Sequence, residues 1–144
     1  MKTDPFVIER TFTAPIPAVW QAITDPGQMK EWYFDLEDFK PEAGFKFQFL
    51  AGSEQKKYLH ICKVTEVREG SKLTYSWQYD NYEGQSWVTF ELFDAGDGKT
   101  RVKLTHTGLG SFPSKDDPAF SKQSFADGWT YIIGTSLKEY LEKE

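Results

Sequence analysis

The N-terminal part of the chain combines one alternating segment with two helical ones. Over residues 6–12 apolar side chains recur at nearly every second position, which is typical of a half-buried strand. The proline-containing stretch 14–17 ends this pattern, and apolar residues then follow helical spacing. Because proline is favoured in the first turn of a helix, the sequence predicts a short helix at 16–24. Asp25-Pro26-Gly27 interrupts it, and a second short helical turn is expected at 28–32.

Between residues 34 and 109 the apolar positions repeat with a period of two. The clearest alternating runs are 45–49, 73–79, 88–92 and 102–106. Turns rich in Gly and Asp separate these runs, so we expect about six strands that pair antiparallel as a meander. The charged residues at the opposite parity predict a solvated outer face. The segment 56–68 carries apolar side chains at both parities, which predicts a bulge or a change of register.

The C-terminal segment returns to helical spacing. Its apolar residues fall on one face of a helix from about 122 to 143: Phe125, Trp129, Ile132, Ile133, Leu137, Tyr140 and Leu141. Gly128 and Gly134 each destabilise such a helix by about 1 kcal/mol relative to Ala, so we expect a packing reason for both. A helix of this length spans roughly 33 Å, enough to cross a sheet.

These elements predict an α+β fold in a single domain over residues 1–144. A curved antiparallel sheet would wrap around the long C-terminal helix, with two short helices after the first strand. A strongly curved sheet that is closed by one helix is rarely filled by its own side chains. The space between sheet and helix is therefore the natural place for a ligand cavity.

Composition narrows the classes of protein. Lys and Arg number 17 against 22 Asp and Glu, a net charge of −5, so we expect no nucleic-acid partner. The single cysteine, Cys62, excludes an intramolecular disulfide and fits a reducing compartment. We find no apolar run of membrane-spanning length and no signal-peptide pattern at residues 1–5. We therefore expect a cytoplasmic protein. As to its assembly, we expect a monomer or a weak dimer.

Aromatic residues are unusually frequent, with five Trp, seven Tyr and twelve Phe making 17% of the chain. Tyr and Trp combine a large apolar surface with a polar tip, which suits both core packing and the walls of a ligand site. Residues predicted to face inward or to lie at the entrance turn form our candidate ligand-binding set: Trp32, Tyr75, Trp77, Tyr79, Phe90, His106 and Trp129. The alternative is that these side chains only pack in an aromatic core that binds no ligand. This must be true of at least half of the aromatic residues in the set.

An ordered set of short motifs resembles one known family. The motifs are Ala14-Pro15, Val19-Trp20, Thr24-Asp25-Pro26, Trp32, residues 64–67, 73–77, 88–92 and 104–108, Gly128-Trp129 and residues 137–141. Together they resemble the activator of Hsp90 ATPase homologue 1-like proteins. These belong to the START-like helix-grip (SRPBCC) superfamily, which also holds polyketide cyclases and plant pathogenesis-related allergens. The resemblance implies the helix-grip fold, a hydrophobic pocket beneath the long helix, a link to stress response and a contact with a chaperone.

The titratable residues offer one catalytic alternative. Strand parity sets His106 on the inward face near the expected pocket, where it would act as general acid or base with Tyr75. The alternative for His106 is a buried histidine satisfied by its neighbours. Cys62 has His60 two residues away, yet small buried cysteines on strands are usually inert. Two histidines and one cysteine without metal-ligand spacing predict no metal site, and we expect no cofactor.

Three hypotheses of different class follow from the sequence. The favoured one is a binding module, more readily non-enzymatic than catalytic, that holds a small hydrophobic or amphipathic molecule in the helix-grip cavity. The second is a cyclase/aromatase- or lyase-type enzyme that uses His106 and a pocket tyrosine such as Tyr75. The third is a module that interacts with the chaperone Hsp90 through outer sheet residues or through the loops near Trp87 and Phe112.

Overall fold

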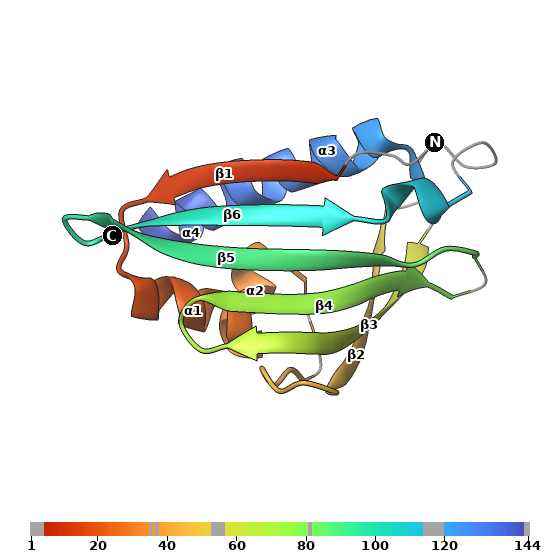
Figure 1. Ribbon diagram of the computed structural model, residues 1–144, viewed down its shortest axis with the longest axis horizontal. Coiled ribbons are helices and arrows are strands. Elements are labelled where there is room, and N and C mark those ends of the chain that lie inside the picture. Colours follow the sequence, from red (N-terminus) through yellow and green to blue (C-terminus); the bar gives the residue numbers. More distant parts are fainter. Residues whose placement is uncertain are drawn as a thin grey trace.

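The computed structural model describes residues 5–34, 36, 38–52, 57–80, 82–113 and 120–142 (Figure 1). The strands are β1 (Phe6–Phe12), β2 (Lys46–Gly52), β3 (Lys57–Arg68), β4 (Lys72–Tyr79), β5 (Ser86–Gly96) and β6 (Lys99–Thr107). The helical elements are α1 (Ile16–Thr24), α2 (Pro26–Trp32), the short 3-10 helix η1 (Leu109–Ser111), α3 (Lys122–Tyr131), the π-helical segment η3 (Ile132–Leu137) and α4 (Lys138–Glu142). In these ranges five strands, rather than about six, follow the short helices, because residues 38–45 form no strand.

The strands form one antiparallel sheet in the order β1-β6-β5-β4-β3-β2. Consecutive strands from β2 to β6 are neighbours, as predicted for a meander, and β1 pairs with β6. The predicted irregularity lies in β3, where the register against β4 shifts between Val64 and Glu66. The extra residue moves the inward face from even to odd positions, which explains the apolar Val67. Leu59 and Ile61 precede the shift and lie at outward positions, so the shift does not account for them. Lys56, included in the predicted segment, lies outside the described residues.

Asp25 separates the two short helices. Its backbone N–H donates to the carbonyl of Gln21 at 2.8 Å at the end of α1. Its carboxylate accepts a hydrogen bond from the N–H of Gly27 at 3.1 Å and caps the start of α2. Because an Asp cap followed by proline is a favourable helix start, α2 begins at Pro26, two residues earlier than predicted.

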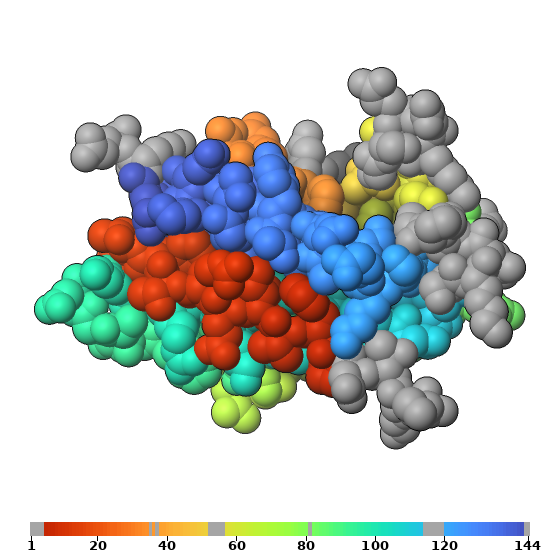
Figure 2. Space-filling model, turned by 90° about the horizontal axis from the view of Figure 1, so that it is seen from above, coloured from red at the N-terminus to blue at the C-terminus, as the bar shows by residue number. Residues whose placement is uncertain are grey.

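The C-terminal elements α3, η3 and α4 continue one another as a single helical rod. The rod lies on the same face of the sheet as α1 and α2 (Figure 1), and seen from above it runs beside β1 (Figure 2). The predicted helix at 122–143 is confirmed over residues 122–142, and residue 143 lies outside the described ranges. The helical periodicity of the sequence did not predict that the middle of the rod, η3, is π-helical. There a Cβ on Gly134 would lie 3.6 Å from Nε of Arg10, so β1 packs closely against this turn.

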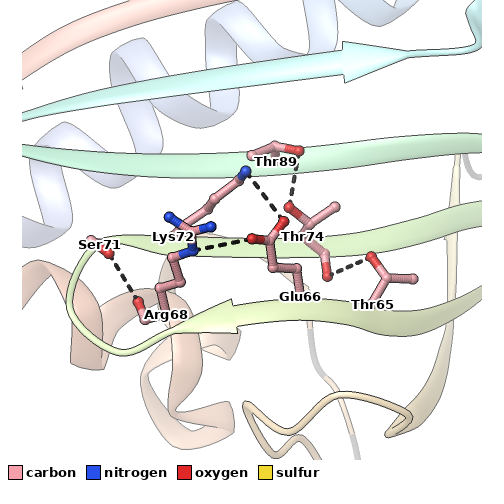
Figure 3. Close-up of polar contacts among 7 residues, drawn as sticks. All are labelled: Thr65, Glu66, Arg68, Ser71, Lys72, Thr74 and Thr89. Atoms are coloured by element: carbon pink, nitrogen blue, oxygen red, sulfur yellow. Dashed lines mark hydrogen bonds and ion pairs between the residues drawn. The ribbon is translucent and has the colours of Figure 1, made fainter.

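The opposite face of the sheet carries charged and polar side chains, as predicted, together with the exposed apolar residues Val7, Leu50 and Trp87. Glu66 on β3 forms ion pairs with Arg68 and Lys72, both at 3.2 Å, and the hydroxyls of Thr74 and Thr89 are hydrogen-bonded at 3.1 Å (Figure 3). Exposed ion pairs of this kind contribute at most about 1 kcal/mol each. This face therefore serves solubility more than stability.

The apolar side chains gather between the sheet and the helices. The largest fully buried ones come from β1, α1, α2, β4, β5, β6, the segment before α3, and η3. A curved antiparallel sheet covered on one face by a long C-terminal helix confirms the predicted α+β helix-grip fold. Within the described ranges, no helix has both the length and the apolar character that crossing a bilayer requires.

Candidate functional site

A cavity of about 260 Å³ lies between the α3 part of the helical rod and strands β2, β3 and β4. It is partly open to solvent among the described residues. Its walls are formed by Phe34, Ala51, Tyr58, His60, Trp77, Tyr79, Phe120, Ser124, Phe125, Gly128, Trp129 and Ile132. Aromatic rings dominate this surface, which makes the cavity suited to an apolar guest.

The strand wall of the cavity is built from rings that support one another. His60 on β3 stacks on Phe49 of β2, with ring centroids 4.5 Å apart and planes 14° from parallel. Trp77 on β4 meets His60 edge-on at 5.0 Å. Trp77 also packs against Trp129 of α3, with ring centroids 5.6 Å apart. Such contacts hold the rings in defined positions, so the shape of the cavity is set before any ligand enters.

His106 lies behind this wall in a continuous chain of hydrogen bonds. The indole N–H of Trp129 donates to Nδ1 of His106 at 2.9 Å. An indole N–H can only donate, so Nδ1 is the acceptor and Nε2 carries the proton of the neutral ring. Nε2 then donates to the hydroxyl of Ser86 at 2.8 Å, and that hydroxyl donates to the carbonyl of Trp77 at 2.9 Å.

The chain of hydrogen bonds decides what His106 can do. Its side chain is fully buried, and burial lowers its pKa to about 3. Both ring nitrogens are used inside the protein, and His106 does not line the cavity. Of the two interpretations of His106, the structure therefore fits the buried histidine whose hydrogen bonds are made with its neighbours. Its hydrogen bond with Trp129 orients the indole ring.

Tyr75 has a similar position behind the wall. Its side chain is fully buried, and its hydroxyl is hydrogen-bonded to the hydroxyl of Tyr33 at 2.7 Å. Burial raises the pKa of Tyr75, and burial together with Tyr75 raises the pKa of Tyr33 well above its usual value. Both phenols stay protonated at neutral pH, so neither supplies a base there.

His60, by contrast, belongs to the cavity wall. It is almost fully buried, and its Nδ1 donates to the backbone carbonyl of Tyr58 at 3.0 Å. Burial lowers the pKa of His60 to about 4, against the opposing effect of hydrogen bonds to the carbonyls of Tyr58 and Phe49. The imidazole is therefore uncharged at neutral pH.

The structure brings together part of the predicted ligand-binding set. Trp77, Tyr79 and Trp129 line the cavity. Four members lie in the packing around it instead: Trp32, Tyr75, Phe90 and His106. The indole N–H of Trp32, for example, donates to the carbonyl of Ala22 at 2.8 Å and holds α2 against α1. Strand parity identified the inward face correctly, but parity carries no information about depth.

Sequence reasoning missed most of the remaining lining residues. Phe125 and Ile132 lie at helical spacing from Trp129, so periodicity alone would have found them, whereas Ser124 and Gly128 lie beside that face. Phe34 and Phe120 come from segments outside the strands and α-helices, where no periodicity points to the site. The packing reason expected for Gly128 is not found, because a Cβ there would have no heavy atom within 4 Å and the described residues leave room for alanine.

Among the residues that the structure describes, no cluster of reactive or metal-binding side chains lies at this cavity. Cys62 is 1% exposed and lies between Phe47 and Trp77 in the sheet register. Burial raises the pKa of its thiol, which keeps it protonated and unreactive. Among the described residues, no group of three or more His, Cys, Asp or Glu side chains has the arrangement to hold a metal ion.

Solved structures with the same fold are numerous. Protein MLL2253 from Mesorhizobium loti is 25% identical, with a TM-score of 0.80 over 97% of this chain and 98% of that one. Protein BH1534 from Bacillus halodurans is 25% identical, with a TM-score of 0.74 over 98% and 99%. DynU16, from the dynemicin biosynthetic locus, shares the fold at 20% identity and a TM-score of 0.76, covering 98% of this chain and 48% of its own.

Sequence comparison assigns the family. Among curated proteins, none matches this chain. The model of the activator of Hsp90 ATPase homolog 1-like proteins matches residues 13–142, which include both short helices, strands β2 to β6 and the helical rod. The chain therefore belongs to the activator of Hsp90 ATPase homolog 1-like protein family.

Proposed function

We propose that this protein binds a small apolar molecule in the cavity between β2–β4 and α3. The observation that carries the proposal is the cavity itself, about 260 Å³ of space walled by aromatic rings inside a small protein. Protein interiors are otherwise close-packed, and each unfilled space lowers stability because its lining loses contacts. A guest would restore those contacts.

The size of the cavity limits the guest. A dry apolar cavity of about 150 Å³ is large enough to bind benzene. About 260 Å³ therefore suits a compound of roughly two fused rings, or a longer one that projects through the opening.

Adjacent residues on β2 provide a direct test. Ala51 lines the cavity, and its neighbour Leu50 points to the other face and is 66% exposed. Ala51→Phe should fill the cavity and abolish binding, whereas Leu50→Phe adds the same ring at the solvent face and should leave binding intact. A panel of one- to three-ring aromatic compounds and lipids would be followed by melting temperature and by tryptophan fluorescence, because Trp77 and Trp129 line the cavity. If no compound changes either signal, or if both variants bind like the wild type, the proposal fails.

Catalysis by His106 and Tyr75 is not part of this proposal. Neither side chain lines the cavity, and the hydrogen bonds of both are made within the protein. A chaperone contact stays an expectation from the family, and no feature of the described surface favours it over ligand binding. Co-purification with Hsp90 and stimulation of its ATPase would test that expectation.

A further inference from the structure

We infer that the cavity selects uncharged ligands that carry a hydrogen-bond acceptor, and that the hydroxyl of Tyr79 donates to this acceptor. The inference rests on the proposed function and adds the chemistry of the ligand to it. Its starting point is the hydroxyl of Tyr79, a residue of the cavity wall, because none of the described residues accepts the hydrogen of this hydroxyl.

The hydrogen bond between Trp77 and Tyr79 shows which way this hydroxyl must act. The indole N–H of Trp77 lies 2.8 Å from the hydroxyl oxygen of Tyr79. Because indole N–H is only a donor, Tyr79 is the acceptor in this bond and keeps its own hydrogen for another partner. No described residue accepts that hydrogen. A hydroxyl that accepts one hydrogen bond is also polarised into a better donor.

The other nitrogen donors on the wall are already used. The indole N–H of Trp129 is bonded to His106, and Nδ1 of His60 donates to the carbonyl of Tyr58. The remaining hydroxyl on the helical wall is that of Ser124, opposite the strand that carries Tyr79. Tyr79 is itself only 7% exposed, so most of the residue is shielded from bulk water. An acceptor on the ligand would therefore meet a donor in an apolar setting, where a hydrogen bond is strong.

The lack of positive charge on the described cavity wall disfavours anionic ligands. Lys and Arg are absent from the described lining residues, and the lowered pKa of His60 leaves its ring neutral at pH 7. A carboxylate or phosphate that enters this cavity would lose its hydration without gaining a cation. The cavity therefore favours neutral ketones, esters or ethers over fatty-acid carboxylates of similar size.

Three naphthalenes of matched size separate these classes. 2-Acetylnaphthalene carries a neutral acceptor, 2-isopropylnaphthalene carries none, and 2-naphthoate is an anion at pH 7. Isothermal titration calorimetry should show 2-naphthoate binding at least about tenfold more weakly than 2-acetylnaphthalene. Equal affinity for the anion would overturn the charge selectivity.

Variants then identify the donor. Tyr79→Phe alone would release the indole N–H of Trp77 as a substitute donor, so the comparison starts from Trp77→Phe, which keeps the hydroxyl. Between Trp77→Phe and the double variant Trp77→Phe/Tyr79→Phe, the ratio of ketone to hydrocarbon affinity should fall about fivefold. The hydrocarbon serves as the control for altered cavity shape, because it makes no hydrogen bond in either variant.

Each outcome has a distinct meaning. If the ratio is the same in both variants, or if Trp77→Phe alone removes the preference, Tyr79 is not the donor and the inference is wrong. If 2-isopropylnaphthalene binds the wild type and Ala51→Phe blocks it, the proposed function survives that failure. If neither neutral compound binds, the inference fails, and the panel of aromatic compounds and lipids then decides whether the proposed function fails with it.

Discussion

Lowering the pH should destabilise this protein already at pH values well above those at which carboxylates titrate. The cause is a pair of buried histidines, His60 and His106, that the fold holds in their neutral forms. His60 is packed between aromatic rings, and both nitrogens of His106 are hydrogen-bonded to neighbours. Neither site offers a carboxylate partner for an imidazolium among its described contacts.

The magnitude follows from the difference between the folded and unfolded chains. In the unfolded chain each imidazole has a pKa near 6.5. In the folded protein burial lowers the pKa to about 4 for His60 and to about 3 for His106. Between those values the unfolded chain binds more protons, so acid favours unfolding. From pH 7 to pH 5 the loss is about 2 kcal/mol for each histidine, or about 4 kcal/mol for the pair.

Urea unfolding followed by tryptophan fluorescence between pH 7 and pH 5 would measure this loss. Glu142, whose pKa is lowered by Lys138 and by the backbone of Thr13, contributes only at lower pH and stays outside this window. Below about pH 6 the unfolding free energy should approach a slope of about 2.7 kcal/mol per pH unit for two protons.

Single variants separate the two contributions. His60→Gln and His106→Asn each remove one titrating group, so each should halve the slope whatever its effect on stability at pH 7. The slopes are compared rather than the absolute stabilities, because His106→Asn also disturbs the hydrogen bond from Trp129. A wild-type stability that is flat between pH 7 and pH 5 would refute the claim that both imidazoles are buried and neutral.

Two further predictions concern the helical rod and the tyrosine pair. Gly128→Ala should raise the unfolding free energy by up to about 1 kcal/mol, because alanine favours the helix and its methyl group meets no atom within 4 Å. A loss of stability in urea titrations would show that the space beside Gly128 is filled. Tyr33→Phe should cost about 1–2 kcal/mol, because it leaves the buried hydroxyl of Tyr75 without its partner. The double variant Tyr33→Phe/Tyr75→Phe should recover part of that loss, and an additive loss would contradict the reasoning.

The sequence predicted most of the elements because their signals are local. The alternation in β4 and β6, the proline start of α1 and the one-sided apolar face of residues 122–142 each depend only on neighbours along the chain. The irregularity in β3 was also expected, and the extra residue places Val67 on the inward face although Val64 before it has the opposite parity. The π-helical segment was not visible, because it changes the winding of the rod without changing which residues are apolar.

The candidate site was predicted only in part, for a reason that Tyr75 and Trp77 illustrate. They lie two residues apart on β4 with the same inward parity, yet Trp77 lines the cavity and Tyr75 is buried beside it. The path of the rod across the sheet and the position of Phe120 decide which part of the inner face stays open. These are contacts between segments far apart in the chain, and no pattern along it encodes their distances.

The amino-acid order by itself determined which side chains face inward, where the helices start, and that aromatic rings supply the interior. Tertiary packing alone decided that His106 uses both ring nitrogens within the protein, and that the hydroxyl of Tyr79 accepts the indole N–H of Trp77. The physical reason is that periodicity sets direction from local geometry, whereas depth, hydrogen-bond pairing and protonation depend on groups that meet only when the rod packs onto the sheet.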